Sequence, residues 1–308
     1  MQLPEYAPSL RDVLEKMTFH RDERTIEIDG QATVVDQDDL AAARLTLWLY
    51  SHLHAGNPDV FTPHAALRDA QFEQDIQARV EDRGIVVPVA PATGSEGQLV
   101  ELHRVRLRVP VGASEDRSSL SLPALRPALS PGFIMYMDDP VPPRSDVPLV
   151  RHYVSVPDPA ETVELWARSV ERLCASGEQF RTKMLSRLAA YPRRDAVVVY
   201  TSGESDWVGE LLREVVAQTG VRTGEASPLC TAVGPGIGRA DEPLDLRPLR
   251  ARQSFGEHRC SLLAEAFVTA LQTGAPVPEV ARAACHDGNV DPEDMSRNVL
   301  RSRQGIAT

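Results

Sequence analysis

The chain has 308 residues, of which 42% are hydrophobic and 25% are charged, as in an ordinary folded protein. This composition excludes a chain that is disordered throughout, a collagen and a coiled-coil rod. The formal net charge is −11, from 33 basic and 44 acidic residues. We therefore expect neither nucleic acid nor a membrane as a partner, and an anionic substrate must be met by a local cluster of basic side chains.

The sequence predicts a cytoplasmic protein. No uncharged apolar run approaches the ~20 residues of a membrane helix, and the first residues do not have the pattern of a secretory signal. The cysteines are far apart and form no C-x-x-C pair, which favours free thiols in a reducing compartment over disulfides or a zinc site. No residue spacing indicates a metal, and no cofactor is expected. The four cysteines are Cys174, Cys230, Cys260 and Cys285.

Lysine is rare in this chain. Of the 33 basic residues, only Lys16 and Lys183 are lysines, so the other 31 are arginines (33 − 2). A guanidinium stays protonated, whereas a lysine amine can lose its proton where its surroundings disfavour the charge. Lys183 lies within a predicted strand. It is therefore either a surface remnant or a residue whose chemistry arginine cannot supply.

Helices and strands that are mixed without strict βαβ alternation predict an α+β fold with a central antiparallel or mixed sheet. We place a soft boundary near residue 145, between an N-terminal region, residues 1–145, and a C-terminal mixed domain, residues 146–308. The N-terminal region reads as mostly helical, and we expect it to bind a peptide or a partner. Its predicted elements are helices over Ser9–Phe19 and Asp38–Ala55, a hairpin of Thr25–Ile28 and Ala32–Val35 turning at Asp29-Gly30, strands between Gly84 and Val111, and loop over 112–149 with one apolar insert, Gly132–Met137.

The second half of the chain has clearer boundaries. Predicted strands are Leu149–Val156, Gln179–Leu185 and Ala196–Thr201, and predicted helices are Ala160–Ser176, Ser205–Thr219 and Ser254–Thr273. Pro228–Pro248 is predicted to be a Gly/Pro-rich loop. Two further segments follow, Pro278–Cys285 and Pro292–Arg301.

Two of these strands each predict a cationic face. Because alternate residues share a face, Arg151 lies with Tyr153, and Arg181 lies with Lys183, whereas His152 points the other way. An exposed sheet face explains either strand alone. Two such strands, one after the other in the chain, favour a cleft lined by these cationic side chains.

A third cationic group lies at the start of a predicted helix. Ser254 and Glu257 form a capping box, which is structural, but His258 and Arg259 follow in the first turn, with Arg252 just before it. Free backbone N–H groups and the helix dipole favour an anion there, so we predict a phosphate site. Arg239, after a Gly-rich segment that fits neither a P-loop nor a dinucleotide fingerprint, is a further candidate.

Several motifs in the second half resemble the HopA-type effector-like proteins, over roughly residues 129–272. They appear in the order Leu129-Ser-Pro-Gly-Phe133, Arg151-His-Tyr153, Phe180-Arg-Thr-Lys183, Tyr191…Arg194-Asp195-Ala-Val-Val-Val-Tyr200, Pro228-Leu-Cys-Thr231, Gly234-Pro-Gly-Ile-Gly238 and Ser254-Phe-Gly-Glu-His-Arg-Cys260. Such proteins occur among bacterial type III effectors and, as stand-alone enzymes, in gene clusters for lanthipeptides and thioamide-containing peptides. The family is in turn similar to the phosphothreonine lyases, which eliminate phosphate without hydrolysis.

The resemblance implies roles for individual residues. Phosphothreonine lyases use a lysine base, which corresponds to Lys183, and a lysine-x-histidine strand, which here reads Arg151-His152-Tyr153. The acid is then Tyr153 by strand register, or His152 if a bulge re-aims it. The residues expected to bind phosphate are Arg151, Arg181, Arg252, His258 and Arg259, followed by Arg239 and Arg194.

The resemblance therefore implies a metal-independent carbon–oxygen lyase. It would convert phosphoserine or phosphothreonine of a ribosomally made precursor peptide to dehydroalanine or dehydrobutyrine, with a Ser/Thr peptide kinase as partner. The main alternative is a non-catalytic subunit that binds a phosphopeptide or leader. A third interpretation is an effector acting on phosphorylated host proteins.

Overall fold

The computed structural model describes residues 6–61, 68–91, 99–102, 105–109, 118–138, 147–203 and 206–300. Its centre is a seven-stranded sheet with the strand order β14-β15-β11-β13-β12-β10-β9, in which every neighbouring pair is antiparallel. The predicted α+β class is confirmed. The strands are β9 (Leu125–Ser130), β10 (Phe133–Met137), β11 (Leu149–Val154), β12 (Phe180–Leu185), β13 (Val197–Ser202), β14 (Thr231–Gly234) and β15 (Ile237–Asp241).

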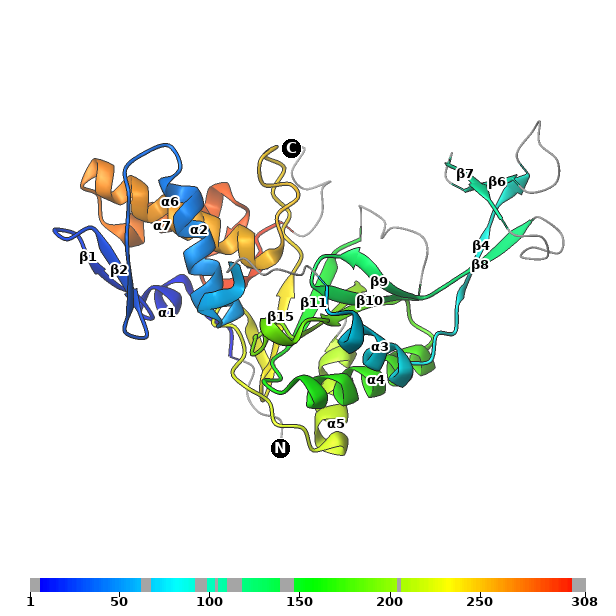
Figure 1. Ribbon diagram of the computed structural model, residues 1–308. Helices are drawn as coiled ribbons and strands as arrows, with labels where there is room; N and C mark the ends of the chain where they lie inside the picture. Colours follow the sequence, from blue (N-terminus) through cyan, green and yellow to red (C-terminus); the bar gives the residue numbers. More distant parts are fainter. Residues whose placement is uncertain are drawn as a thin grey trace.

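Helices α4 (Pro159–Ser176) and α5 (Asp206–Thr219) cover one face of this sheet (Figure 1). Both helices bury an apolar stripe against strand residues, and the indole N–H of the fully buried Trp166 donates to the Thr182 hydroxyl at 3.0 Å. Asp158 caps the start of α4, and Gly177 ends it with φ 73°, a left-handed conformation that glycine adopts without strain. This face of the sheet is therefore covered by helices and belongs to the hydrophobic core.

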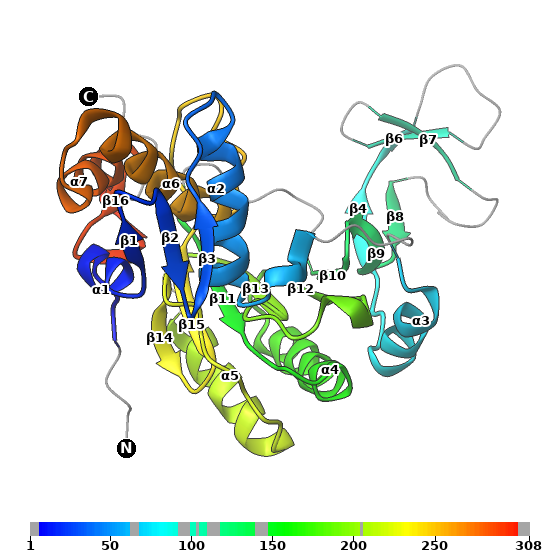
Figure 2. The same ribbon diagram turned by 60° about the vertical axis from the view of Figure 1, so that its left-hand side comes forward.

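The other face is only partly covered, by helix α2 (Ala41–Leu49), the π-helix η1 (Tyr50–Ala55) and helix α6 (Phe255–Thr273). The predicted capping box of α6 is present: Ser254 accepts from the Glu257 N–H, and Glu257 accepts from the Ser254 N–H. Elements from the two ends of the chain lie side by side here, because α1 (Leu10–Leu14) and α2 pack on α7 (Val277–Asp287) and α6 (Figure 2).

The predicted N-terminal hairpin is confirmed as β2 (Thr25–Ile28) and β3 (Gln31–Val34), joined through Asp29 and Gly30, which have φ of 50° and 77°. The predicted helix Ser9–Phe19 is wrong in its second half. It ends at Leu14, and Thr18–His20 forms strand β1, which pairs with β2. Pairing across the sheet satisfies these backbone groups in place of helix hydrogen bonds.

An arm of short strands extends from the body (Figure 2). It follows α3 (Ala70–Arg79) and confirms the strand character predicted between residues 84 and 111. Part of the loop predicted over 112–149 is instead β8 and β9, and its apolar insert is β10. The arm contains β4 (Ile85–Pro88), β5 (Ala90–Pro91), β6 (Leu99–Leu102), β7 (Val105–Arg108) and β8 (Ser119–Leu122).

The loop predicted over Pro228–Pro248 is wrong, because it contains the hairpin β14–β15. Its turn uses Gly236, with φ 66° and backbone atoms so close that a side chain would clash. Strands β16 (Val290–Asp291) and β17 (Asp294–Asn298) follow α7, and 3-10 turns occupy Pro58–Phe61 and Leu188–Ala190.

Strands from both sides of residue 145 lie in the same sheet, so the predicted domain division does not coincide with a break in it. Among the described helices, none combines the length and apolar character that crossing a bilayer requires.

Candidate active site

A row of three large polar side chains crosses the centre of the partly covered face. Tyr200 on the middle strand β13 is paired with Arg151 on β11 and with Arg181 on β12. Directly paired residues point to the same side of an antiparallel sheet. The predicted cationic faces of the two strands are therefore joined into one surface.

This row forms the floor of an open cleft of about 280 Å³. Its walls combine apolar, hydroxyl and charged groups. The lining residues are Met135, Leu149, Arg151, Gln179, Phe180, Arg181, Tyr200, Thr201, Ser202 and Glu242. Among the described residues, no group of three or more His, Cys, Asp or Glu side chains is placed to hold a metal ion.

Arg151 is held from two sides. Its guanidinium forms a two-pronged ion pair with Glu242, one prong of which joins Nη2 to Oε1 at 2.6 Å, and its Cζ lies 5.0 Å from the centre of the Tyr200 ring. The Arg151 side chain is only 11% exposed, and these contacts hold its positive charge in the floor of the cleft. The fork of a guanidinium matches two phosphate oxygens, but here Glu242 occupies it, so a phosphate would use this fork only by displacing that carboxylate.

Lys183 lies one row further along the same face, two residues from Arg181 and paired with Val198. Its Nζ is 4.0 Å from the centre of the Phe133 ring on β10. No carboxylate in the described part of the chain forms an ion pair with this amine. Lys183 thus has a defined position against the Phe133 ring and forms no ion pair among the described residues, although its charge helps to lower the pKa of the Asp195 carboxyl.

A buried ion pair lies next to this amine. The Arg193 Cζ is 5.5 Å from the same Phe133 ring, and its guanidinium pairs with Asp195 at 2.6 Å. Arg193 also donates to the Tyr50 hydroxyl at 3.0 Å. Burial raises the pKa of Asp195, but the Arg193 charge and hydrogen bonds outweigh it and lower that pKa to about 2. Asp195 is therefore ionised.

Tyr153 shares the face with Lys183 but is covered. His54 from η1 lies 5.1 Å from its ring and Phe255 from α6 lies 6.0 Å away, and Tyr153 is only 3% exposed. Its hydroxyl has no hydrogen-bond partner among the described residues, and burial raises its pKa well above the usual range. Tyr153 is therefore walled off from the cleft.

His152 lies on the opposite face, against the α4–α5 layer. Strand β11 pairs with both neighbours without a register shift, so the bulge that would re-aim His152 does not occur. The ring is fully buried, and desolvation, aided by the Arg239 charge, lowers its pKa to about 3. The sheet therefore separates His152 from Lys183, and the condition under which His152 was expected to be the acid is not met.

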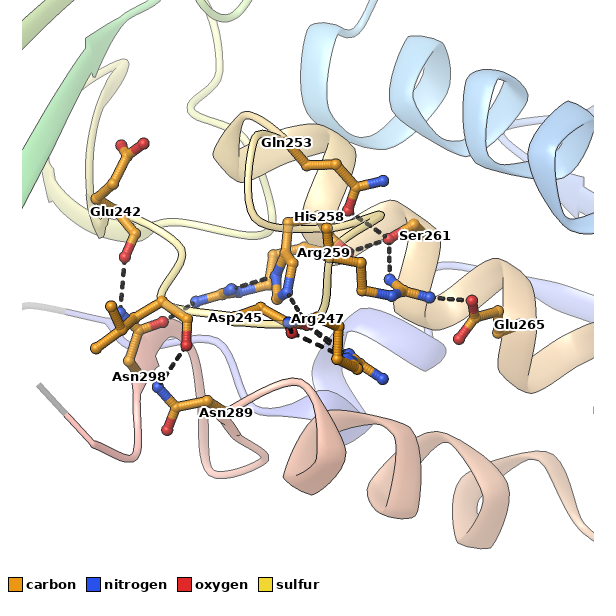
Figure 3. Close-up of polar contacts among 12 residues, drawn as sticks. Glu242, Asp245, Arg247, Gln253, His258, Arg259, Ser261, Glu265, Asn289 and Asn298 are labelled. Atoms are coloured by element: carbon orange, nitrogen blue, oxygen red, sulfur yellow. Dashed lines mark hydrogen bonds and ion pairs between the residues drawn. The ribbon is translucent and has the colours of Figure 1, made fainter. Parts of the chain in front are cut away.

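The basic residues predicted to bind phosphate at the start of α6 are turned away from the cleft (Figure 3). Arg259 is fully buried and donates to the Met295 oxygen at 2.8 Å, to His258 Nδ1 at 2.7 Å, and to the Arg297 and Asn298 oxygens. His258 Nδ1 accepts that bond, so its Nε2–H donates to Asp245 at 3.0 Å. These donors are taken, and the cluster braces α6 against β17.

The remaining predicted phosphate residues also lie apart from the cleft. Arg239 is on the closed face, 3.7 Å from Asp206. Arg194 donates to the main-chain oxygens of His52 and Leu53. Arg252 is exposed in the loop before α6. Arg151, Arg181 and Lys183 are thus the basic members of the predicted set that share the open face.

Sequence reasoning did not identify Tyr200, Glu242 or Phe133 as site residues. Tyr200 could have been found, because it belongs to a predicted strand and its position relative to the β11 and β12 arginines follows from antiparallel pairing. Glu242 could not, because it follows a strand that the sequence pattern presented as loop.

Comparison with known proteins places the chain in a family. The protein-family model described as "HopA1 effector protein family" matches residues 124–297. The chain is similar to the solved effector protein from Pseudomonas syringae pv. syringae strain 61, at 16% identity and a TM-score of 0.46, over 79% of this chain and 84% of that one.

It is also similar to the solved effector protein from Pseudomonas syringae pv. tomato strain DC3000, at 15% identity and a TM-score of 0.47, over 85% and 94% of the two chains. No curated protein matches the chain. The family match spans more than half of the sequence, including every strand of the central sheet, and the protein belongs to the HopA1 effector protein family.

Proposed function

We propose that this protein is a phosphoserine/phosphothreonine lyase. It eliminates phosphate from a kinase-phosphorylated, ribosomally made precursor peptide and leaves dehydroalanine or dehydrobutyrine. The observation that carries the proposal is the placement of a lysine amine with no ion-pair partner among the described residues, on the same face as Arg151 and Arg181. Membership of the HopA1 effector protein family is consistent with the proposal, since that family is similar to the phosphothreonine lyases.

The chemistry requires two functions from the protein. A base must take the α-hydrogen of the phosphorylated residue, and cations must hold the phosphate while it departs. Lys183 is the proposed base. Arg181, two residues away on the same strand, and Arg151, across Tyr200, are the proposed phosphate ligands.

The layout of the face fits an extended peptide whose phosphate and α-carbon lie a few ångströms apart. Same-face neighbours along a strand are roughly 7 Å apart, and adjacent strands are roughly 5 Å apart. The Arg151–Tyr200–Arg181 row therefore receives the phosphate while the Lys183 row faces the backbone of the same residue. A Ser/Thr peptide kinase supplies the substrate in this proposal.

Mass spectrometry of a phosphorylated precursor peptide tests the proposal. The wild-type protein should remove the elements of phosphoric acid, and Lys183→Ala should lower turnover by about 10²–10⁴-fold, the usual contribution of a general base. Lys16→Ala is the matched control, because Lys16 is the other lysine of the chain and is exposed.

The same experiment separates the non-catalytic alternative. A phosphopeptide-binding subunit would hold the peptide without changing its mass, and Lys183→Ala would then alter affinity alone. Its supporting observation is that the position matching the expected histidine is Tyr153, whose hydroxyl is buried.

A further inference from the structure

We infer that Tyr200 donates the proton that the departing phosphate takes up. This inference rests on the proposed lyase function and assigns its missing acid. Tyr200 lines the cleft and stands between Arg151 and Arg181, each paired with it across the sheet. It is the phenol closest in register to both proposed phosphate ligands.

The geometry fixes the ring and leaves the hydroxyl uncommitted. The Arg151 guanidinium lies 5.0 Å from the ring centre, which holds the ring between the arginines. No hydrogen bond to the Tyr200 hydroxyl is formed within the described part of the chain. A phosphate bound by the two flanking arginines would therefore meet a phenol O–H that is free to donate.

The other candidate acids lack this access. His152 is on the closed face with both ring nitrogens buried. Tyr153 is on the correct face, but His54 and Phe255 cover it. Glu242 reaches the cleft as the ionised partner of Arg151, and an ionised carboxylate has no proton to donate.

The proposed step balances without a co-reactant. The Lys183 amine takes the α-hydrogen, and the C–H electron pair becomes the new Cα=Cβ bond. The Cβ–O bond breaks, and its electron pair goes to the bridging oxygen, which takes the Tyr200 proton. The products are the dehydro residue and hydrogen phosphate. Transfer of the proton from the Lys183 ammonium to the tyrosinate, through solvent, restores both groups.

The ionisation of the substrate provides a specific test. A phosphate monoester has a second pKa of about 6. Above that pH the phosphate ester is a dianion, and its phosphate is a poor leaving group unless an acid protonates the bridging oxygen. Below that pH the monoanion already carries a proton and has less need of one. The rate ratio of Tyr200→Phe to wild type should therefore depend on pH, while effects on the base cancel in the ratio.

The experiment measures kcat of wild type, Tyr200→Phe and Tyr153→Phe on one phosphopeptide between about pH 5.5 and pH 8, to either side of that pKa. Tyr200→Phe should be slower by about 10²–10⁴-fold at the upper end and recover most of that loss at the lower end. Tyr153→Phe, the matched control, should show a pH-independent ratio. Phosphopeptide affinity, measured in parallel, should be largely kept by Tyr200→Phe.

Other outcomes overturn the inference. A Tyr200→Phe variant as active as wild type, or equally impaired at every pH, excludes proton donation by this phenol. A pH-dependent loss in Tyr153→Phe instead assigns the acid to Tyr153. A wild-type protein that leaves the phosphopeptide intact at every pH refutes the lyase proposal itself, and this result is distinct from failure of the Tyr200 variant alone.

Discussion

The Lys183 amine lies 4.0 Å from the centre of the Phe133 ring, on the neighbouring strand β10. Packing against the ring face sets where the amine rests. Phe133 also lies 5.5 Å from the Arg193 Cζ, so one aromatic ring contacts both the proposed base and the guanidinium of the buried Arg193–Asp195 pair. Phe133 is therefore a positioning residue for Lys183.

Replacing Phe133 tests this relationship. Phe133→Leu removes the flat ring against which the amine rests, and we expect kcat to fall by roughly 3- to 10-fold, equivalent to about 1 kcal/mol, because the base is then less well positioned. Phe133→Tyr keeps the ring and should retain most of the rate. Steady-state kinetics at a temperature where both variants are folded checks this. Equal rates for all three proteins would show that the ring does not position the amine.

The carboxylate of Glu242 occupies the Arg151 fork that phosphate needs. Glu242→Gln removes the competing charge while keeping the shape. We expect inorganic phosphate to bind roughly 3- to 10-fold more tightly, equivalent to about 1 kcal/mol. Glu225→Gln is the control, since Glu225 is an exposed carboxylate paired with Arg194. Calorimetric titration measures both, and weaker binding to Glu242→Gln would mean that Glu242 instead orients Arg151.

Arg259 should behave as a structural residue. Lysine cannot supply the directed donors that meet Met295, His258, Arg297 and Asn298, so Arg259→Lys should lower the free energy of unfolding by about 3–5 kcal/mol. Urea denaturation measures this loss. Phosphate affinity of the folded fraction should stay at the wild-type value. A large loss of phosphate affinity without a loss of stability would restore Arg259 to the binding site.

Three buried histidines predict a pH-dependent stability. Desolvation lowers the pKa of His54 to about 4, and desolvation together with nearby arginines lowers those of His152 and His258 to about 3. The unfolded chain takes up protons near pH 6.5 and the folded chain does not. Stability should therefore fall as the pH drops below about 6.5, by about 1.4 kcal/mol per pH unit for each histidine, until the folded-state values are reached.

Denaturant titrations across this range measure the slope. His152→Leu should reduce it by the share of one histidine, whereas His286→Asn should leave it unchanged because His286 is exposed. A stability that is flat between pH 6.5 and 4.5, below the ordinary histidine value, would contradict the burial of these rings.

The sequence predicted much of the sheet because period-two patterns are local. The alternation that grouped Arg151 with Tyr153 and Arg181 with Lys183 holds, since both strands are regular and unbulged. Strand order is not local. The pairing of Tyr200 with two arginines on different strands depends on long-range contacts that no single segment encodes.

The expectation that His258 and Arg259 are exposed at the start of α6 differs from the structure for a related reason. A basic residue in the first turn of a helix opposes the dipole and suggested an anion there. Arg259 instead points inward, where the C-terminal strand β17 supplies carbonyl and amide oxygens. A partner nearly forty residues away compensated the charge, and nothing in the local sequence indicates it.

The most direct test of the account is elimination from a phosphoserine peptide carrying deuterium at Cα. If Lys183 takes the α-hydrogen, the product is unsaturated and has lost its deuterium, and a rate limited by chemistry is slower than that of the protonated peptide. A product that keeps the deuterium and regains the serine hydroxyl would show hydrolysis, and it would contradict the role given to Lys183.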